Sequence, residues 1–261
     1  GNFTVHILTR PRYVDPKKCI ACGVCAEKCP VTTADAFEHN LSRRKAIYLL
    51  YPQTVPLAYS IDPDTCIYLR KGTCGACAKY CPADAVDLED TAQDLQLQVG
   101  AIIFTAGMQP FDPSGLDTYA YSDLANVITS IEFERMLAAG GPTQGELVRL
   151  SDNRPARKIA WLQCVGSRNI NECDHEYCSG VCCMYAVKEA VLAKDHMGDD
   201  LQATIFFMDL RTPGKDFEKA VFNAQRQGVR FIRSRIHSLT LADESGTLSL
   251  RSATENGQMV T

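Results

Sequence analysis

The stretch Cys19-Ile-Ala-Cys22-Gly-Val-Cys25-Ala-Glu-Lys-Cys29-Pro30 decides how the early part of the chain folds. Three closely spaced cysteines in a tight loop can occupy three corners of one cubane [4Fe–4S] cluster, whereas the fourth begins the following helix and faces away. That fourth cysteine must serve another cluster, so the pattern predicts a pair of clusters. Pro30 ends the hydrogen bonding of the loop and suits the first turn of a helix.

A second motif supplies the partner, because the spacing recurs in Cys74-Gly-Ala-Cys77-Ala-Lys-Tyr-Cys81-Pro82, with Cys66 upstream. We therefore assign one cluster to Cys19, Cys22, Cys25 and Cys81, and the other to Cys66, Cys74, Cys77 and Cys29. Small residues between these ligands let backbone N–H groups approach the cluster sulfurs; they are Ala21, Gly23, Gly75 and Ala76.

The thirteen cysteines are clustered and odd in number, and nothing resembles a signal peptide. A disulfide framework is therefore not expected, because such frameworks belong to short secreted chains. We expect a reducing, cytoplasmic environment. Zinc is the alternative metal, since paired Cys-x2-Cys is common in zinc sites. A zinc site, however, needs only four ligands and does not explain why the spacing Cys-x2-Cys-x3-Cys-Pro occurs twice. Iron–sulfur clusters are therefore favoured.

The bulk composition excludes some functions. The formal net charge of −4 over 261 residues gives no reason to expect a nucleic-acid partner. Hydrophobic residues make up 46% and charged residues 22%, which is ordinary for a globular protein. No apolar run approaches the roughly 18–20 residues that span a bilayer, so the chain is not expected to cross a membrane.

The rest of the chain divides into segments 1–12, 13–90, 91–155 and 156–261. Residues 1–12 read as a strand, and residues 13–90 as one compact module holding eight cysteines. Apolar and polar residues alternate from Leu95 to Val99, and Ala101-Ile-Ile-Phe104 reads as a buried strand. A helix should follow at Glu132–Leu137, capped by Ser130 and stopped by Gly140-Gly141-Pro142.

From residue 156 the pattern becomes β-α-β and predicts a parallel sheet with packed helices. The last residues read as a hairpin around Glu244-Ser245-Gly246. The expected strands cover 159–164, 203–208 and 229–232, and the expected helices cover about 182–195 and 217–227.

Five cysteines remain in this last segment. Cys164 ends a strand, and Cys178, Cys182 and Cys183 surround the start of the next helix, where thiolates are stabilised. A nucleotide phosphate sits at such a place in a Rossmann unit, but the turn Cys164-Val-Gly-Ser-Arg168 lacks G-x-G-x-x-G. We infer a metal or redox site. The alternative is a set of buried free cysteines. Cys173 is interpreted as a spare.

With these motifs in place, the chain resembles the family of the heterodisulfide reductase A subunits, which are iron–sulfur flavoproteins. The resemblance extends over nearly the whole sequence. It is carried by Pro11-Arg-Tyr-Val-Asp15, Arg44-Lys-Ala-Ile-Tyr48, Pro52-Gln-Thr-Val-Pro56, Val99-Gly-Ala-Ile-Ile103, Asn126-Val-Ile-Thr129, Glu132-Phe-Glu-Arg135, Gln163-Cys-Val-Gly-Ser-Arg168, Tyr177-Cys-Ser179 and Cys182-Cys-Met-Tyr185.

The resemblance implies an α/β fold with an α+β insert: a two-cluster ferredoxin-like module inside a thioredoxin-reductase-like, Rossmann-type flavoprotein framework. Residues 1–12 would then be a strand of an FAD-domain remnant, 91–155 its continuation and linker, and 156–261 a degenerate Rossmann-like domain. The family's FAD-binding G-x-G-x-x-G is absent from this sequence. The resemblance also implies FAD in the full-length protein, with Thr105, Ala106 and Gly107 as the remaining contacts, and a third [4Fe–4S] cluster on Cys164, Cys178, Cys182 and Cys183.

The function implied by the resemblance is electron transfer in a flavin-based electron-bifurcating complex, in which electrons pass between FAD and the clusters. Its expected partners are the other subunits of a heterodisulfide-reductase-like complex and ferredoxin or hydrogenase-type electron donors. Two alternatives stay open: a stand-alone ferredoxin-type electron carrier, and a related component of a quinone-interacting redox complex.

Overall fold

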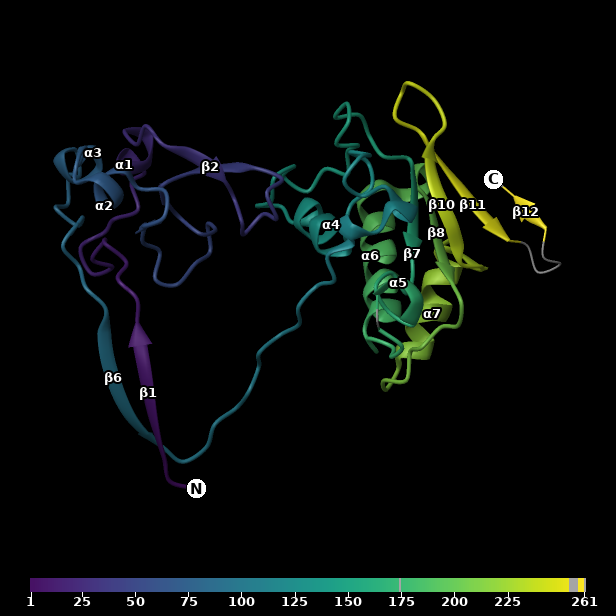
Figure 1. The fold of residues 1–261 in the computed structure, drawn as a ribbon, viewed down its shortest axis with the longest axis horizontal. Coiled ribbons are helices and arrows are strands. Elements are labelled where there is room, and N and C mark those ends of the chain that lie inside the picture. Colours follow the sequence, from purple (N-terminus) through teal and green to yellow (C-terminus); the bar gives the residue numbers. More distant parts are fainter. Residues whose placement is uncertain (174, 254–257, 261) are drawn as a thin grey trace. The chain divides into compact units, whose positions relative to one another are not determined.

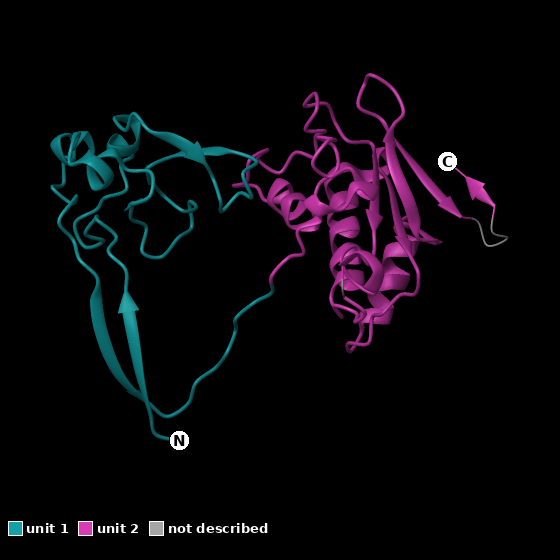
Figure 2. Cartoon of the chain, in the orientation of Figure 1, with its two compact units in different colours: residues 1–108 teal, residues 109–261 magenta. Residues whose placement is uncertain are grey.

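The computed structural model describes residues 1–173, 175–253 and 258–260. The chain forms two compact units, residues 1–108 and residues 109–261 (Figure 2), and each is described by itself.

The first unit begins and ends in a two-stranded antiparallel ribbon (Figure 1). Strand β1 (Phe3–Thr9) pairs with β6 (Gln93–Val99) in a register that places Phe3 opposite Val99 and Thr9 opposite Gln93. The predicted strand in residues 1–12 and the alternation before Val99 are therefore confirmed as strands. The two strands of the ribbon flank the cysteine-rich module, one before it and one after it in the sequence.

Between these strands lies a module of short elements. Strand β2 pairs with β3, and β4 with β5, both antiparallel. The elements are α1 (Val24–Glu27), β2 (Thr32–Ala34), β3 (Arg43–Lys45), β4 (Ile47–Tyr48), β5 (Ser60–Ile61), α2 (Ile67–Lys71) and α3 (Ala76–Lys79). A small core of Val14, Ala46, Ile47, Ile61 and Ala85 packs with Cys25 and Cys66. A core of this size contributes little stability by itself.

Polar contacts tie the entry and exit of the module together. The backbone N–H of Arg12 donates to Asp90 Oδ2 at 2.9 Å, and that of Tyr13 donates to the same oxygen at 3.1 Å. In the interior, Arg44 pairs with Asp62 at 2.8 Å. The two bonds to Asp90 hold the two ends of the cysteine-bearing segment together.

The predicted buried strand at Ala101–Phe104 is wrong. These residues have no strand partner in the structure, and the side chains of Ile103 and Phe104 are 86% and 89% exposed. A strand becomes buried only when neighbouring strands pair with it and other elements cover its faces. In the first unit the nearby strands β1 and β6 form a two-stranded sheet, and residues 101–104 do not join it.

The second unit is built on a parallel sheet of order β7-β8-β9. Its strands are β7 (Lys158–Leu162), β8 (Gln202–Phe207) and β9 (Arg230–Arg233), joined through α6 (Cys182–Met197) and α7 (Phe217–Arg226). The predicted parallel α/β arrangement is confirmed here. Cys164, expected at the end of the first strand, lies in the turn two residues beyond it.

Small side chains bring the helices of the second unit close to its sheet. Ala203 and Ile205 of β8 are completely buried, as are Ala190 of α6 and Ala224 of α7. The Trp161 ring of β7 meets Phe133 edge-on, with ring centroids 5.5 Å apart. Alanines at these contacts allow close packing, and the aromatic pair fills the remaining volume.

A three-stranded antiparallel sheet follows, with the order β10-β11-β12. Its strands are β10 (Ile236–Leu241), β11 (Leu248–Ala253) and β12 (Met259–Val260). The turn between β10 and β11 contains the predicted hairpin residues 244–246, so that prediction is confirmed. Asp243 Oδ1 accepts hydrogen bonds from the backbone N–H groups of Ser245 (2.9 Å) and Thr247 (3.2 Å), which fixes the turn.

The helix predicted at Glu132–Leu137 forms as α4 (Ser130–Leu137), but Thr129, not Ser130, is its N-cap. Thr129 and Glu132 form a reciprocal capping box, so Ser130 already lies inside the helix. The helix ends at Leu137, before the predicted glycine stop. The remaining short elements are α5 (Ile170–Cys173) and 3-10 turns at Pro113–Gly115, Asp117–Tyr119 and Gly198–Asp200.

Candidate metal centres

The first cavity of the cysteine-rich module is lined by four cysteines from both sequence motifs. They are Cys19, Cys22, Cys25 and Cys81. Gly23, with φ +83°, starts α1 and turns the loop so that Cys22 precedes the helix and Cys25 lies within it. Cys81 follows α3 and reaches the same space from the second motif. The structure thus gathers the four residues that the sequence assigns to one cluster.

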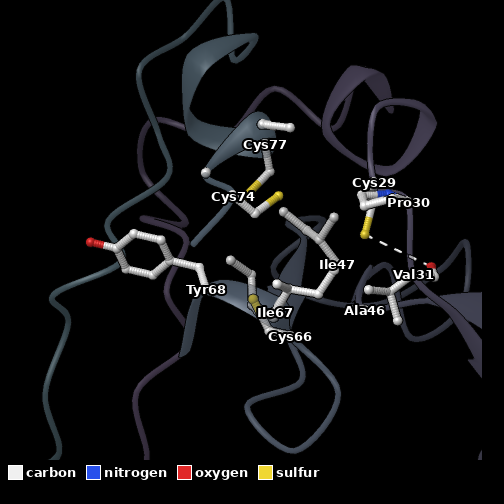
Figure 3. A pocket seen from close by; sticks show the side chains of 13 residues that line it. Cys29, Pro30, Val31, Ala46, Ile47, Cys66, Ile67, Tyr68, Cys74 and Cys77 are labelled. Atoms are coloured by element: carbon white, nitrogen blue, oxygen red, sulfur yellow. Dashed lines mark hydrogen bonds between the residues drawn. The ribbon is translucent and has the colours of Figure 1, made fainter. Parts of the chain in front are cut away.

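The second cavity, drawn in Figure 3, is also lined by cysteines of both motifs. Its cysteines are Cys29, Cys66, Cys74 and Cys77. Gly75, with φ +90°, starts α3 as Gly23 starts α1. Cys29 crosses over from the first motif. The prediction that this cysteine begins a helix is wrong, because Cys29 follows α1 and the chain continues through Pro30 into strand β2. The predicted exchange of the last cysteine between the motifs is therefore the arrangement found; ligation itself stays a prediction.

Small and apolar residues complete both cavities. Ala21 and Gly23 line the first cavity, and Gly75 and Ala76 line the second, so the backbone borders the space between the thiols. Apolar side chains fill the remaining walls; they include Val14, Ala85 and Val86 in the first cavity and Val31, Ile47 and Ile61 in the second. Such walls exclude water and lower the local dielectric, which tunes the potential of a bound cluster.

Burial and the neighbouring thiols disfavour the ionised form of one cysteine in each cavity. Burial raises the pKa of Cys25 to about 11, and the neighbouring Cys19, Cys22 and Cys81 add to the rise. In the second cavity, burial likewise raises the pKa of Cys77, with contributions from Cys66, Cys29 and Cys74. Four thiolates in one low-dielectric space repel each other, and a bound metal cluster neutralises them. Each donor set, four soft sulfurs, fits iron of a [4Fe–4S] cluster.

The cysteines of the second unit meet where β7 ends and α6 begins. Cys164 lies in the turn after β7 with φ +63°, and Cys182 and Cys183 form the first turn of α6. The loop carrying Cys178 is fastened to this turn because Ser167 Oγ donates to Tyr177 O at 2.8 Å and accepts from the N–H of Ser179 at 3.2 Å. Cys164, Cys182 and Cys183 thus interact directly, and Cys178 is close enough to influence Cys164 electrostatically.

The pKa of Cys182 is shifted in the opposite direction from the pKa values of Cys164 and Cys183. Hydrogen bonding with Cys164 and Cys183 lowers the pKa of Cys182 strongly, whereas hydrogen bonding with Cys182 and burial raise the pKa values of Cys164 and Cys183. The N-terminal position of Cys182 in α6 also favours a thiolate. Arg168 adds positive charge near Cys164. This sulfur-rich site, too, has the donor chemistry of a cluster site.

The other residues of interest behave differently. Cys173 packs against the apolar group that includes Leu116, Tyr119 and Leu239, in keeping with its interpretation as a spare. Thr105, Ala106 and Gly107 are all exposed, in a segment that forms no helix or strand. The role of these three residues in flavin binding stays a prediction.

Sequence reasoning missed Tyr59, which lines the first cavity. Burial raises the pKa of its hydroxyl, and Cys25, Cys22 and Cys19 raise it further, so the phenol lies in the field of these thiols. It also missed Arg168, which pairs with Asp209 beside the second-unit cysteines. Neither position follows a motif. Arg168 was singled out only because it lies in one of the stretches that carry the family resemblance, and no sequence signal pointed to Tyr59.

The comparisons with known proteins agree with this geometry. Residues 18–85 match the family described as "4Fe-4S dicluster domain", which implies two [4Fe–4S] clusters. The chain is 39% identical over 253 residues to the A subunit of the "H(2):CoB-CoM heterodisulfide,ferredoxin reductase" of Methanothermobacter thermautotrophicus, covering 97% of this chain and 37% of the relative. It is 43% identical over 252 residues to the second iron–sulfur A subunit of the "CoB--CoM heterodisulfide reductase" of Methanopyrus kandleri, with 96% and 37% covered.

The chain is a homologue of one segment of the A subunit of heterodisulfide reductase. A third relative, the A subunit of the "Ferredoxin/F(420)H(2)-dependent CoB-CoM heterodisulfide reductase" of Methanosarcina acetivorans, is 38% identical over 237 residues, or 90% of this chain and 29% of the relative. The chain thus spans 37% of the length of the first two relatives and 29% of the third. Within the described residues, no helix has the length and apolar character that crossing a membrane requires.

Proposed function

We propose that this chain is an electron-transfer segment of a heterodisulfide-reductase-like, flavin-based electron-bifurcating complex. The observation that carries the proposal is the pair of cavities, each lined by four cysteines that two crossed motifs supply. When bound there, [4Fe–4S] clusters accept and donate single electrons. The chain's own residues hold these groups, exclude water with apolar walls and offer backbone N–H groups to the sulfurs.

The second-unit cysteines support a third cluster in the same proposal. A cluster on Cys164, Cys178, Cys182 and Cys183 would lie where β7 ends and α6 begins, the position at which a Rossmann unit binds a phosphate. In the full-length protein, FAD would exchange electrons with the clusters, and Thr105–Gly107 would contribute to its site. The partners would be the other complex subunits and ferredoxin or hydrogenase-type donors, in the cytoplasm, where thiols stay reduced.

Iron and acid-labile sulfide per chain, after anaerobic reconstitution, test the cluster content. Three four-iron clusters predict about twelve irons and a matching amount of sulfide. Cys178→Ala should lose about four irons. Cys173→Ala is the matched control, because it removes a cysteine of the same unit that packs into an apolar group instead, and it should lose none. Equal iron in all three proteins would contradict the third cluster.

A stand-alone electron carrier is the second candidate function. The observation that favours it is that residues 1–108 form a compact unit containing both cavities, while Thr105–Gly107 are exposed. Absorbance after desalting discriminates between the two. A retained flavin band supports the flavoprotein proposal, and iron–sulfur absorbance alone supports the carrier. Stoichiometric zinc with little iron would contradict both functions and support a zinc-stabilised interaction module.

A further inference from the structure

The two cavities of the first unit have equal sets of cysteines but different tyrosines. Tyr59 lines the first cavity, and Tyr68 lines the second. The hydroxyl of Tyr68 donates to Glu89 Oε1 at 3.1 Å, and Figure 3 shows it pointing away from the four cysteines. The side chain therefore offers the second cavity only the apolar part of its ring.

The hydroxyl of Tyr59 lies instead against the first motif. A Cβ atom added to Gly23, between Cys22 and Cys25 in the sequence, would lie 3.4 Å from Tyr59 Oη. In the part of the chain that the structure describes, this hydroxyl makes no hydrogen bond with another residue. Its donor proton is thus available at the edge of the cavity that Cys19, Cys22, Cys25 and Cys81 surround.

The backbone around Tyr59 holds the phenol in this place. Arg12 Nε donates to Tyr59 O at 2.9 Å, and the N–H of Ile61 donates to Arg12 O at 3.1 Å. The residue before the tyrosine, Ala58, is only 1% exposed. Because Arg12 is also bonded to Asp90, the tyrosine is anchored to both ends of the module. A hydroxyl held in place in this way loses little conformational entropy when it forms a hydrogen bond.

We propose that the Tyr59 hydroxyl donates a hydrogen bond to sulfur at the Cys19–Cys22–Cys25–Cys81 site and makes this site the more readily reduced of the two. The inference rests on the proposed function, in which both cavities hold [4Fe–4S] clusters. Reduction adds one electron and hence one negative charge, and a donor to sulfur stabilises the more negative state. An electron shared between the two sites therefore comes to rest on the site beside Tyr59.

The test is a redox titration of the full chain, anaerobically reconstituted and followed by electron paramagnetic resonance. Tyr59→Phe removes the donor and keeps the ring. The equilibrium constant for reducing the Cys19 site should fall by up to about tenfold, which corresponds to a potential lower by about 59 mV for one electron. Tyr68→Phe is the matched control and should leave both potentials of the module unchanged, since its hydroxyl faces Glu89.

Cys22→Ser assigns the reduction steps, because only the site that contains Cys22 should shift or disappear. A step of that site that moves to lower potential in Tyr59→Phe, with iron content equal to wild type, supports the inference. An unmoved step, or a shift confined to the other site, overturns it and leaves the proposed function intact. A wild-type chain that binds no clusters overturns both.

Discussion

Replacing Glu189 by glutamine should remove a pH dependence of stability from the second unit. Glu189 lies on α6, is 3% exposed, and accepts a hydrogen bond from Trp161 Nε1 at 2.8 Å through Oε2. Its other oxygen, Oε1, has no hydrogen-bond partner among the described residues. Burial, with a smaller contribution from the charge of Glu134, raises the pKa of Glu189 from 4.5 to about 8. The neutral acid is therefore the form that the core accepts.

Proton linkage gives the sign and the size of this pH dependence of stability. Between pH 4.5 and about 8 the folded state binds the proton and the unfolded state does not, so stability falls as the pH rises. At about 1.4 kcal/mol for each pH unit, the full rise in pKa amounts to about 5 kcal/mol. From pH 5.5 to 7.5 the free energy of unfolding should therefore fall by about 3 kcal/mol through this group. Glutamine keeps an acceptor for Trp161 and cannot ionise.

Urea denaturation followed by tryptophan fluorescence measures this directly, because Trp161 is the only tryptophan of the chain. The free energy of unfolding of Glu189→Gln, relative to that of wild type, should increase as the pH rises. Glu218→Gln removes a carboxylate from the exposed face of α7, so its free energy of unfolding should change with pH in the same way as that of wild type. Parallel curves for Glu189→Gln and wild type from pH 5.5 to 7.5 would refute the reasoning.

Three further predictions concern the cap, the loop geometry and the crossed cysteines. Thr129→Ala removes the capping box of α4 and should cost about 1 kcal/mol in the same fluorescence assay; an unchanged urea midpoint would contradict it. Gly75→Ala meets no atom within 4 Å but must adopt φ +90°, so it should cost about 1 kcal/mol, seen as loss of cluster absorbance at lower urea. Gly115→Ala, which meets no atom and has no positive φ, should have no such effect. Cys29→Ala should abolish the same paramagnetic signal as Cys74→Ala, and loss of the other signal would contradict the crossed arrangement.

Much of the fold was predictable because its signals are local. The cysteine spacings force tight loops, and the switch from period-two to helical patterns marks the strands and helices of the second unit. The predicted helix at 182–195 is found as α6 (Cys182–Met197), and the hairpin at 244–246 joins β10 and β11. Boundaries were less predictable, as Thr129 shows: both Thr129 and Ser130 can cap a helix, and only the capping box with Glu132 selects one of them.

The failure at Ala101–Phe104 has a different cause. Apolar composition shows that a segment can be buried, but burial also needs partner strands that other parts of a chain must supply. The grouping of Cys164 with the α6 cysteines shows the opposite case. There the parallel register of β7 and β8, together with the bonds from Ser167, brings distant residues to one place.

The sequence by itself determined the two cysteine motifs, their need for each other and the crossing of Cys29 and Cys81. It could do so because three corners of a cluster are reached by cysteines only a few positions apart, which leaves the fourth cysteine of each motif for the other cluster. The helix expected after that fourth cysteine is not formed; the short helices α1 and α3 precede Cys29 and Cys81 instead. Only the tertiary structure decided what surrounds those thiols. Tyr59 faces the first cavity and Tyr68 turns its hydroxyl to Glu89, although the sequence around them shows no pattern that separates the two. The direction of a side chain depends on anchors such as Arg12, which lie far away in the chain and close by only after folding.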